Sequence, residues 1–186
     1  MPRTYGESFI HVSEIDGFLC AWEPLPESRP PVIGEEDRAI GRYVADLIRD
    51  GMTLGVSGFG AFASPDYVME AMSRKFKEQN TPRDLTIVSG VAPGDFVEDG
   101  CGLSKIKDEG IIKTLIASHL RMSPAIGRAC SENKIAAFSM PLGVYGQLMN
   151  AIGSKRPGII THVGLNTYAD PRQDGCKMNA LAKADG

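Results

Sequence analysis

The sequence has little of what marks several classes of protein. Its four cysteines are far apart and form no C-x-x-C pair, which fits reduced thiols better than a disulfide framework or a zinc site. The 20 basic and 23 acidic residues give a net charge of -3 without a basic run, so the charge pattern of a nucleic-acid binder is missing. No apolar run approaches the roughly 18 residues of a membrane span, and no secretory leader is visible. We therefore expect a cytoplasmic protein that binds neither nucleic acid nor membrane.

Histidines are also few, and this weakens the case for a metal centre. The three, His11, His119 and His162, lie too far apart in sequence to form a ligand pair on one element. We predict no metal site, and a structural role is the default for each histidine. His119 is the exception to examine, because it follows a predicted strand, and parallel sheets gather their sites at the carboxyl ends of strands.

What the sequence does contain is a regular alternation of helical and strand-like segments. Its hydrophobic content of 42% is enough to bury one core. Alternating strands and helices predict an α/β fold with a parallel sheet covered on both faces. The predicted helices span about residues 36–50, 65–78, 104–109, 124–133 and 143–152, and the predicted strands span 53–57, 85–88, 111–117, 135–138 and 159–163.

The first 35 residues read differently from the rest. Residues 9–12 and 17–22 are strand-like but have no evident local partner, and four prolines between residues 24 and 31 favour an extended linker. We therefore divide the chain into an N-terminal segment, residues 1–35, and a folded domain, residues 36–186.

The loop of residues 55–64 is the strongest candidate for a functional element. It is rich in glycine and joins a buried strand to a helix that we expect to start with Ser64 as N-cap and Pro65 at the first helical position. Its amides can face an anion or oxyanion. The alternative is that the glycines only allow a tight turn.

Two better-known phosphate motifs do not fit this loop. Residues 58–63 match G-x-G-x-x-A, but Pro65 starts the helix after the motif, and the next strand ends in Ser89-Gly90 without an acidic residue. The chain also lacks the G-x-x-x-x-G-K-[ST] pattern. A dinucleotide or nucleoside triphosphate site is therefore disfavoured.

Asp95 and His119 complete the candidate site, because each follows a predicted strand at its carboxyl end. For Asp95 the alternative is equally open: a loop aspartate that holds a turn through hydrogen bonds to nearby amides.

A series of colinear motifs resembles one family. Residues 50–59, Asp-Gly-Met-Thr-Leu-Gly-Val-Ser-Gly-Phe, with Pro65, resemble the D-G-x-x-hydrophobic-G-G-F-x-x-x-G-x-P signature of the first half of the family I coenzyme A transferases. The departures are Ser57 and Ala63, where the signature has glycine, and Pro93, where relatives tend to have glutamine. Further matches to the propionate and short-chain acyl-CoA transferases are residues 82–88, 110–113, 132–135, 141–144, 157–161, 163–165 and 170–172.

The N-terminal segment resembles a different branch of these proteins. Residues 1–4, 8–13, 23–26 and 37–41 are similar to the junction between the halves of acetyl-CoA hydrolases and 4-hydroxybutyrate CoA-transferases. There the junction precedes the second half, whereas here it precedes a sequence like the first half.

The resemblance implies a three-layer α/β domain of the CoA-transferase-like (NagB/RpiA-like) type, incomplete at its C-terminus. It implies ping-pong transfer of CoA between a short-chain acyl-CoA and a carboxylate through a glutamyl thioester. That glutamate lies in the second, or beta, half, whose motif is missing here, so we expect no catalytic residue in this chain and no activity from it alone. We expect no permanently bound cofactor, coenzyme A as substrate, and a hetero- or homo-oligomer. The residues expected to line the cleft are Ser57, Gly58, Phe59, Gly60, Asp95 and His119.

Two alternatives remain at this point. The altered positions and the missing glutamate also suit a non-catalytic or truncated relative that binds CoA, and the N-terminal resemblance suits part of an acyl-CoA hydrolase. Sugar-phosphate isomerases and lactonases share the general fold, which does not choose among functions.

Overall fold

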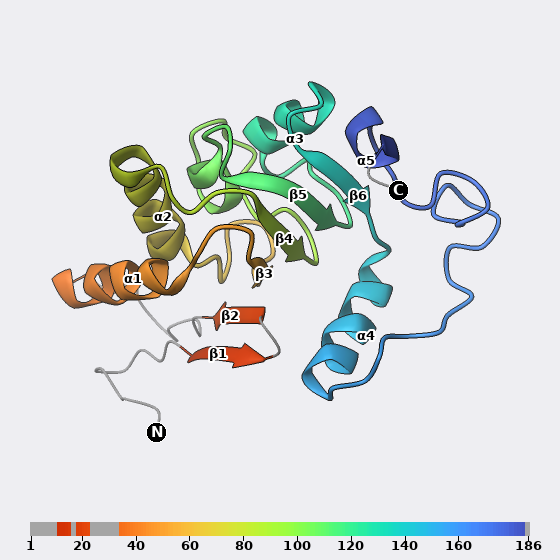
Figure 1. Ribbon diagram of the computed structural model, residues 1–186, viewed down its shortest axis with the longest axis horizontal. Helices are drawn as coiled ribbons and strands as arrows, with labels where there is room; N and C mark the ends of the chain where they lie inside the picture. The colour runs from red at the N-terminus through yellow and green to blue at the C-terminus, as the bar shows by residue number, and fades with distance from the viewer. Residues whose placement is uncertain (1–10, 16–17, 23–33, 185–186) are drawn as a thin grey trace.

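The computed structural model describes residues 11–15, 18–22 and 34–184 and shows an α/β fold (Figure 1). The α/β class expected from the sequence is confirmed. The strands are β1 (His11–Ile15), β2 (Phe18–Trp22), β3 (Thr53–Val56), β4 (Leu85–Ser89), β5 (Ile112–Ala117) and β6 (Ala136–Ser139). The helices are α1 (Glu35–Leu47), α2 (Asp66–Gln79), the 3-10 helix η1 (Gly102–Ile106), α3 (Pro124–Ser131), α4 (Leu142–Gly153) and α5 (Ala180–Ala184).

The strands form one sheet in simple sequence order, β1-β2-β3-β4-β5-β6. Strands β2 to β6 are parallel, and β1 is antiparallel to β2. The expectation that the two N-terminal strand-like pieces lack a local partner is therefore wrong, because they pair with each other from His11 opposite Trp22 to Ile15 opposite Phe18. Residues 9 and 10 of the first piece lie outside the described residues.

The core lies between one face of the sheet and four helical elements. Leu54, Ile87, Leu115 and Ala137 are in register across β3 to β6 and are all buried. Residues of α1, α2, η1 and α3 join them in one hydrophobic cluster. Because each right-handed crossover moves to the next strand in the same direction, the crossover helices come to lie on the same face. On the opposite face Thr86, Thr114, Ile116 and Phe138 are only partly buried.

The helix that follows the glycine loop begins one residue later than predicted. Pro65, not Ser64, occupies the N-cap position of α2, and no side chain caps the helix. The Ser64 carbonyl accepts the Asp66 amide at 2.8 Å, while the Ser64 hydroxyl is buried without a partner in the described part of the chain. Ser123 occupies the N-cap position of α3, but its hydroxyl donates to the Pro93 carbonyl at 2.7 Å and does not cap the helix.

The last 30 residues fold differently from the prediction. Residues 159–163 form no strand, and Ile160 is fully exposed. Instead, residues 176–179 run beside β6: the Ser139 amide donates to the Cys176 carbonyl and the Met178 amide to the Ala137 carbonyl, each at 2.8 Å. Helix α4, light blue in Figure 1, extends away from the sheet beyond β6.

Within the residues that the structure describes, none of the helices combines the length and the apolar character that crossing a bilayer requires.

Candidate functional site

The glycine loop after β3 is closed at its tip. Phe59 and Phe62 exchange backbone hydrogen bonds of 3.0 and 3.1 Å, and Gly60 adopts a φ of 62° between them. The two phenylalanine rings remain exposed, at 62% and 67%. In the described part of the chain the amides of Gly58 and Gly60 donate to no protein acceptor. The Gly58 and Gly60 amides can therefore serve an oxyanion, whereas those of Phe59 and Phe62 are already engaged.

Three loops meet at the carboxyl ends of β3, β4 and β5, and we call residues 57–65, 90–102 and 118–123 the carboxyl rim. The Gly94 amide donates to the Gly60 carbonyl at 3.0 Å, which ties the second loop to the first. The Ala92 amide donates to the His119 carbonyl at 3.0 Å, which ties the second loop to the third. The sequence-predicted candidates thus lie on loops that touch, as the common direction of the strands requires.

Glycines make this close approach possible. A side chain at Gly58 would place its Cβ 3.0 Å from that of Pro93. A Cβ at Gly102, which has a φ of 67°, would overlap the Pro93 carbonyl oxygen. That oxygen already accepts the Ser123 hydroxyl at 2.7 Å and the Leu103 amide at 2.9 Å. The second loop is therefore fixed by several contacts around one carbonyl group.

Asp95 holds this loop together. Its carboxylate accepts the amides of Val97 at 3.2 Å and Cys101 at 3.3 Å. Burial opposes its ionisation, but these amides outweigh burial and lower the pKa of the carboxyl group. The contacts favour the turn-holding alternative for Asp95 over direct contact with a substrate.

The loop that Asp95 holds presents an apolar tip. Phe96 has a φ of 65°, an uncommon conformation for a bulky residue. Its amide donates to the Met122 carbonyl at 2.9 Å, and its ring is 58% exposed. The rim therefore carries exposed phenylalanines on two of its three loops.

His119 adds a polar group to the rim. Its Nδ1 is buried and, like the Ser64 hydroxyl, has no hydrogen-bond partner among the described residues. Buried polar atoms are seldom left unpaired, so each is a candidate to bind a ligand or a bridging water. Ser139, at the end of β6, continues the edge by donating to the Ser118 carbonyl at 3.0 Å.

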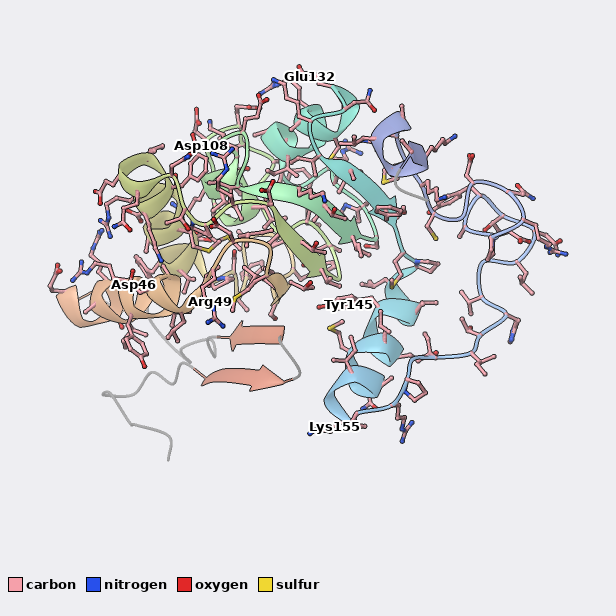
Figure 2. The ribbon with its side chains drawn as sticks, in the orientation of Figure 1. Asp46, Arg49, Asp108, Glu132, Tyr145 and Lys155 are labelled. Atoms are coloured by element: carbon pink, nitrogen blue, oxygen red, sulfur yellow. The ribbon has the colours of Figure 1, made fainter. Side chains whose placement is uncertain are left out.

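A hollow lies at the edge of the sheet opposite to the rim. A space of about 350 Å³ opens between the amino ends of β5 and β6, η1 and α3, near Asp108 and Glu132 in Figure 2. Its cations are already neutralised: Lys107 pairs with Asp99, Arg128 with Glu98, and Lys134 with Glu109 and Glu132. No unpaired cation in this hollow is left for a phosphate, so we place the candidate site at the carboxyl rim.

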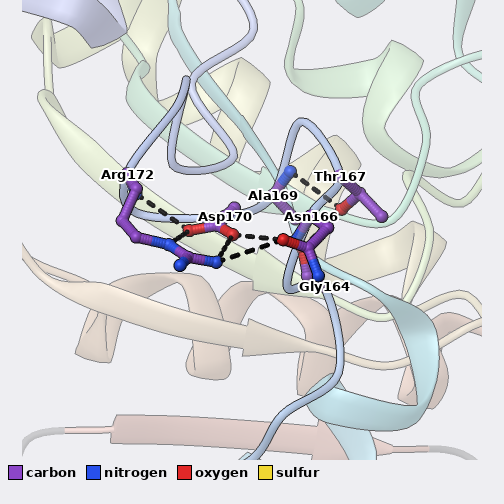
Figure 3. Close-up of polar contacts among 6 residues, drawn as sticks. All are labelled: Gly164, Asn166, Thr167, Ala169, Asp170 and Arg172. Carbon is purple, nitrogen blue, oxygen red and sulfur yellow. Dashed lines mark hydrogen bonds and ion pairs between the residues drawn. The ribbon is translucent and has the colours of Figure 1, made fainter.

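The sequence did not reveal a buried carboxylate, that of Asp170, which accepts several hydrogen bonds (Figure 3). Asp170 is 1% exposed and accepts Arg172 Nε at 2.9 Å, Arg172 Nη2 at 2.6 Å and the Asn166 amide at 2.7 Å. The guanidinium of Arg172, together with the backbone amides of Asn166 and Arg172, holds the pKa of Asp170 well below its ordinary value. In the sequence, residues 170–172 stand out only as one of the matches to the family. An aspartate followed by proline, among other turn-forming residues, nevertheless predicts a turn held by the aspartate side chain.

The described residues offer binding groups but few reactive ones. Burial, with the carboxylates of Asp66 and Asp95, raises the pKa of the Cys101 thiol to about 11, and burial does the same for Cys130. Neither is a thiolate near neutral pH. No cluster of three metal-type side chains occurs in the part of the chain that the structure describes. The rim thus offers a ligand backbone donors, exposed phenylalanine rings and two buried polar atoms without a partner among the described residues.

Comparisons with known proteins agree with the sequence resemblance. The profile of the coenzyme A transferase family matches residues 38–184. Acetate CoA-transferase YdiF of Escherichia coli K12 is 34% identical over 163 residues, covering 87% of this chain and 29% of the relative. Caffeate CoA-transferase of Acetobacterium woodii is 39% identical over 144 residues, covering 77% and 27%. Acetate CoA-transferase subunit alpha of E. coli K12 is 28% identical over 124 residues, covering 67% and 52%.

A solved structure shares both fold and sequence. The acyl-CoA transferase YdiF of E. coli O157:H7, solved as a thioester complex with CoA, superposes with a TM-score of 0.69 at 34% identity. The match covers 76% of this chain and 27% of that one. The chain spans less than a third of the length of YdiF and of caffeate CoA-transferase, and about half of the length of the alpha subunit. It belongs to the coenzyme A transferase family.

Proposed function

We propose that this chain is the first-half domain of a CoA-transferase that moves CoA between a short-chain acyl-CoA and a carboxylate acceptor. The observation that carries the proposal is the carboxyl rim, where three loops within the family match are joined backbone to backbone. Two relatives are named as an acetate CoA-transferase and a caffeate CoA-transferase, and these names support a carboxylate as the acceptor of CoA. The proposal includes a cytoplasmic location and no permanently bound cofactor.

The chemistry needs a carboxylate nucleophile, which we assign to a glutamate on a second half. Its oxygen attacks the thioester carbonyl and expels CoA thiolate, forming an acyl-glutamyl anhydride. The thiolate then attacks the glutamyl carbonyl, releasing the acyl carboxylate and leaving a glutamyl-CoA thioester. The acceptor carboxylate reverses both steps. The thioester complex with CoA reported for YdiF supports this route.

The rim supplies binding and electrostatic functions in this scheme. The amides of Gly58 and Gly60 are free to donate to the oxyanion that forms at each attacked carbonyl. His119 Nδ1 is placed to receive a hydrogen bond from a substrate or a bound water. Ser57 and Phe59 belong to the same rim loop as Gly58 and Gly60. Asp95 holds the neighbouring rim loop in place through its hydrogen bonds to backbone amides.

The test is transfer of CoA from acetyl-CoA to labelled propionate, measured with the chain alone and with a second half supplied. We expect transfer only when both are present, and a trapped CoA adduct whose mass shift lies on a glutamate of the second half. His119→Gln should reduce transfer, whereas Tyr43→Gln, exposed on α1, should not. Transfer that persists without the second half, or an adduct on this chain, would refute the proposal.

A non-catalytic CoA-binding role is the second candidate. It is favoured by Ser57, Ala63 and Pro93, which replace signature residues at the rim, and by the engagement of the Phe59 and Phe62 amides with each other. Calorimetric binding of CoA to the chain, together with no turnover after addition of the second half, would favour this role. A part in an acyl-CoA hydrolase instead predicts release of free acid from acetyl-CoA without an acceptor.

A further inference from the structure

Three exposed phenylalanines of the carboxyl rim are grouped around one backbone hydrogen bond. The Gly94 amide donates to the Gly60 carbonyl at 3.0 Å. Phe59 and Phe62 lie within two residues of Gly60, and Phe96 follows Gly94 by two residues. Their rings are 62%, 67% and 58% exposed. Two loops that come from different strands thus bring three aromatic rings to one part of the rim.

Phe59 and Phe62 project from the same side of their loop. Each donates its amide to the carbonyl of the other, as in the hydrogen-bonded pair of an antiparallel bridge. The side chains of two directly opposed residues lie on one face, where they are close enough to interact. The two rings therefore form an apolar wall. Because Phe59 stands between Gly58 and Gly60, this wall begins within one residue of both amides that have no acceptor in the described part of the chain.

The backbone holds these rings exposed in an uncommon conformation. Phe96 has a φ of 65°, and Ala63, which follows Phe62, has a φ of 54°. Residues other than glycine seldom adopt a positive φ, and they keep it only where neighbouring contacts fix it. For Phe96 such a contact is its amide, which donates to the Met122 carbonyl at 2.9 Å. Backbone of this kind is concentrated at functional sites, which favours a binding role for the exposed rings.

The two loops that carry the phenylalanines offer no cation. The glycine loop, within residues 57–65, has no charged side chain. The charged residues of the second loop, within residues 90–102, are all acidic, namely Asp95, Glu98 and Asp99. Arg121, on the third loop, is the one Lys or Arg residue of the rim. A carboxylate placed against the rings would lose water without gaining an ion pair from either of their loops, which disfavours it.

We propose that Phe62 and Phe96 make the rim selective for short apolar acyl groups such as butyryl, over acetyl and over dicarboxylic acyl groups such as succinyl. This rests on the proposed function, because it takes the thioester oxygen to lie at the Gly58 and Gly60 amides. The acyl chain then extends from the carbonyl carbon onto the phenylalanine wall. Each methylene group that is fully buried there strengthens binding by about fourfold. Phe62 falls at a position that the signature of the glycine loop leaves open, so the selectivity is a property of this chain.

The first measurement is binding to the chain alone, which does not depend on turnover. Butyryl-CoA, acetyl-CoA and succinyl-CoA are titrated separately to millimolar concentration and followed through the amide NMR signals of Gly58 and Gly60. The CoA part is common to the three esters, so the ratios of their dissociation constants report on the acyl group. With rings on one side of the chain only, we expect butyryl-CoA to bind at least about threefold tighter than acetyl-CoA, and succinyl-CoA no tighter than acetyl-CoA.

Three results of this titration overturn the proposal. They are equal binding of the three esters, no binding of butyryl-CoA, and tightest binding of succinyl-CoA. The last result would assign the acyl group to Arg121 instead of the phenylalanines.

Matched variants locate the selectivity. Phe62→Ala and Phe96→Ala should each bring the ratio of butyryl-CoA to acetyl-CoA affinity closer to one. Phe62→Leu and Phe96→Leu keep an apolar side chain and should retain most of the ratio, and thermal unfolding shows whether each variant is folded. The control, Tyr43→Ala, removes an exposed ring of α1 and should leave the ratio unchanged. A ratio that survives both alanine changes overturns the proposal.

Transfer with a second half supplied separates this proposal from the proposed function. If transfer occurs, kcat/KM for butyryl-CoA as donor should exceed that for acetyl-CoA by about tenfold, and equal values refute the selectivity alone. Selective binding without transfer refutes only the proposed function. If the rings instead contact another polypeptide, the alanine changes weaken association with the second half and leave the ester ratio unchanged, which also overturns the selectivity.

Discussion

Single residues determine how closely the loops of the carboxyl rim approach one another. Gly94 lies where a Cβ would overlap the Met122 carbonyl of another rim loop, and Gly102 lies where a Cβ would overlap the Pro93 carbonyl of its own loop. The Asp95 carboxylate occupies the space beside Gly100. Each of these contacts joins residues that the chain would otherwise hold apart. The geometry of the candidate site therefore depends on the absence of side chains as much as on their presence.

We predict opposite effects for two glycine-to-alanine changes. Gly102→Ala should destabilise the chain by more than about 1 kcal/mol, because it combines a positive φ with overlap at the Pro93 carbonyl. Gly146→Ala, in α4 with no atom within 4 Å of the new methyl group, should be neutral or stabilising by up to about 1 kcal/mol. Urea unfolding of the two variants measures both, and equal midpoints would contradict this account of the rim.

The candidate site was predictable at the level of loops but not of atoms. The sequence placed Ser57 to Gly60, Asp95 and His119 after strands, and the common direction of parallel strands brings such loops together. It did not reveal that Phe59 and Phe62 bond to each other, or that Ser64 leaves its hydroxyl unpaired. The loop is also in contact with residues some 30 positions away in the sequence: Gly94 donates to the Gly60 carbonyl, and Pro93 lies beside Gly58. Such distant contacts cannot be read from the local sequence.

At the scale of elements, the sequence predicted the buried strands β3 to β6 correctly. It predicted wrongly a further strand that would have had to pair with the outer edge of the sheet. Strands β3 to β6 are short apolar runs, and each has a neighbour already in place. Residues 159–163 have the same apolar character but form no strand, because residues 176–179 already bond to the free edge of β6. An apolar run predicts burial, whereas a strand also requires unpaired backbone groups beside it.

The turn around Asp170 should depend on pH. Its folded-state pKa lies below the ordinary value of about 4, so its contribution to stability is complete above that value. It is lost as pH falls through the lower folded pKa. We expect the NMR signals of the Asn166 and Arg172 amides, which both donate to Asp170, to remain in place at pH 4 and to shift only at lower pH, as Asp170 becomes protonated in the folded protein.

A matched variant tests the same turn at neutral pH. Asp170→Asn cannot ionise and loses its ion pair with Arg172, so trypsin should cleave after Arg172 faster than in the unaltered chain. Cleavage after Arg49, on the opposite side of the molecule (Figure 2), should not change. Unaltered cleavage at Arg172, together with amide signals that do not move in acid, would show that other contacts hold the turn.

At the scale of the whole molecule, stability depends on the single core between the sheet and α1, α2, η1 and α3. Leu115, on β5, is fully buried at its centre. Leu115→Ala should cost about 2–5 kcal/mol through lost burial and the cavity left behind. Ile160→Ala, at a fully exposed site, should change stability by less than about 0.5 kcal/mol. Urea unfolding followed by circular dichroism checks both, and similar losses of stability would mean that the Ile160 side chain is part of the core.

The segment beside β6 has a further consequence for the molecule in solution. A free strand edge recruits strands from other molecules and is a common origin of aggregation. Here the Cys176 and Met178 backbone and the Asn179 side chain occupy the outward hydrogen-bonding groups of residues 135, 137 and 139. Another molecule can therefore add a strand to this edge only after residues 176–179 detach from β6. The segment thus protects the protein against aggregation through β6.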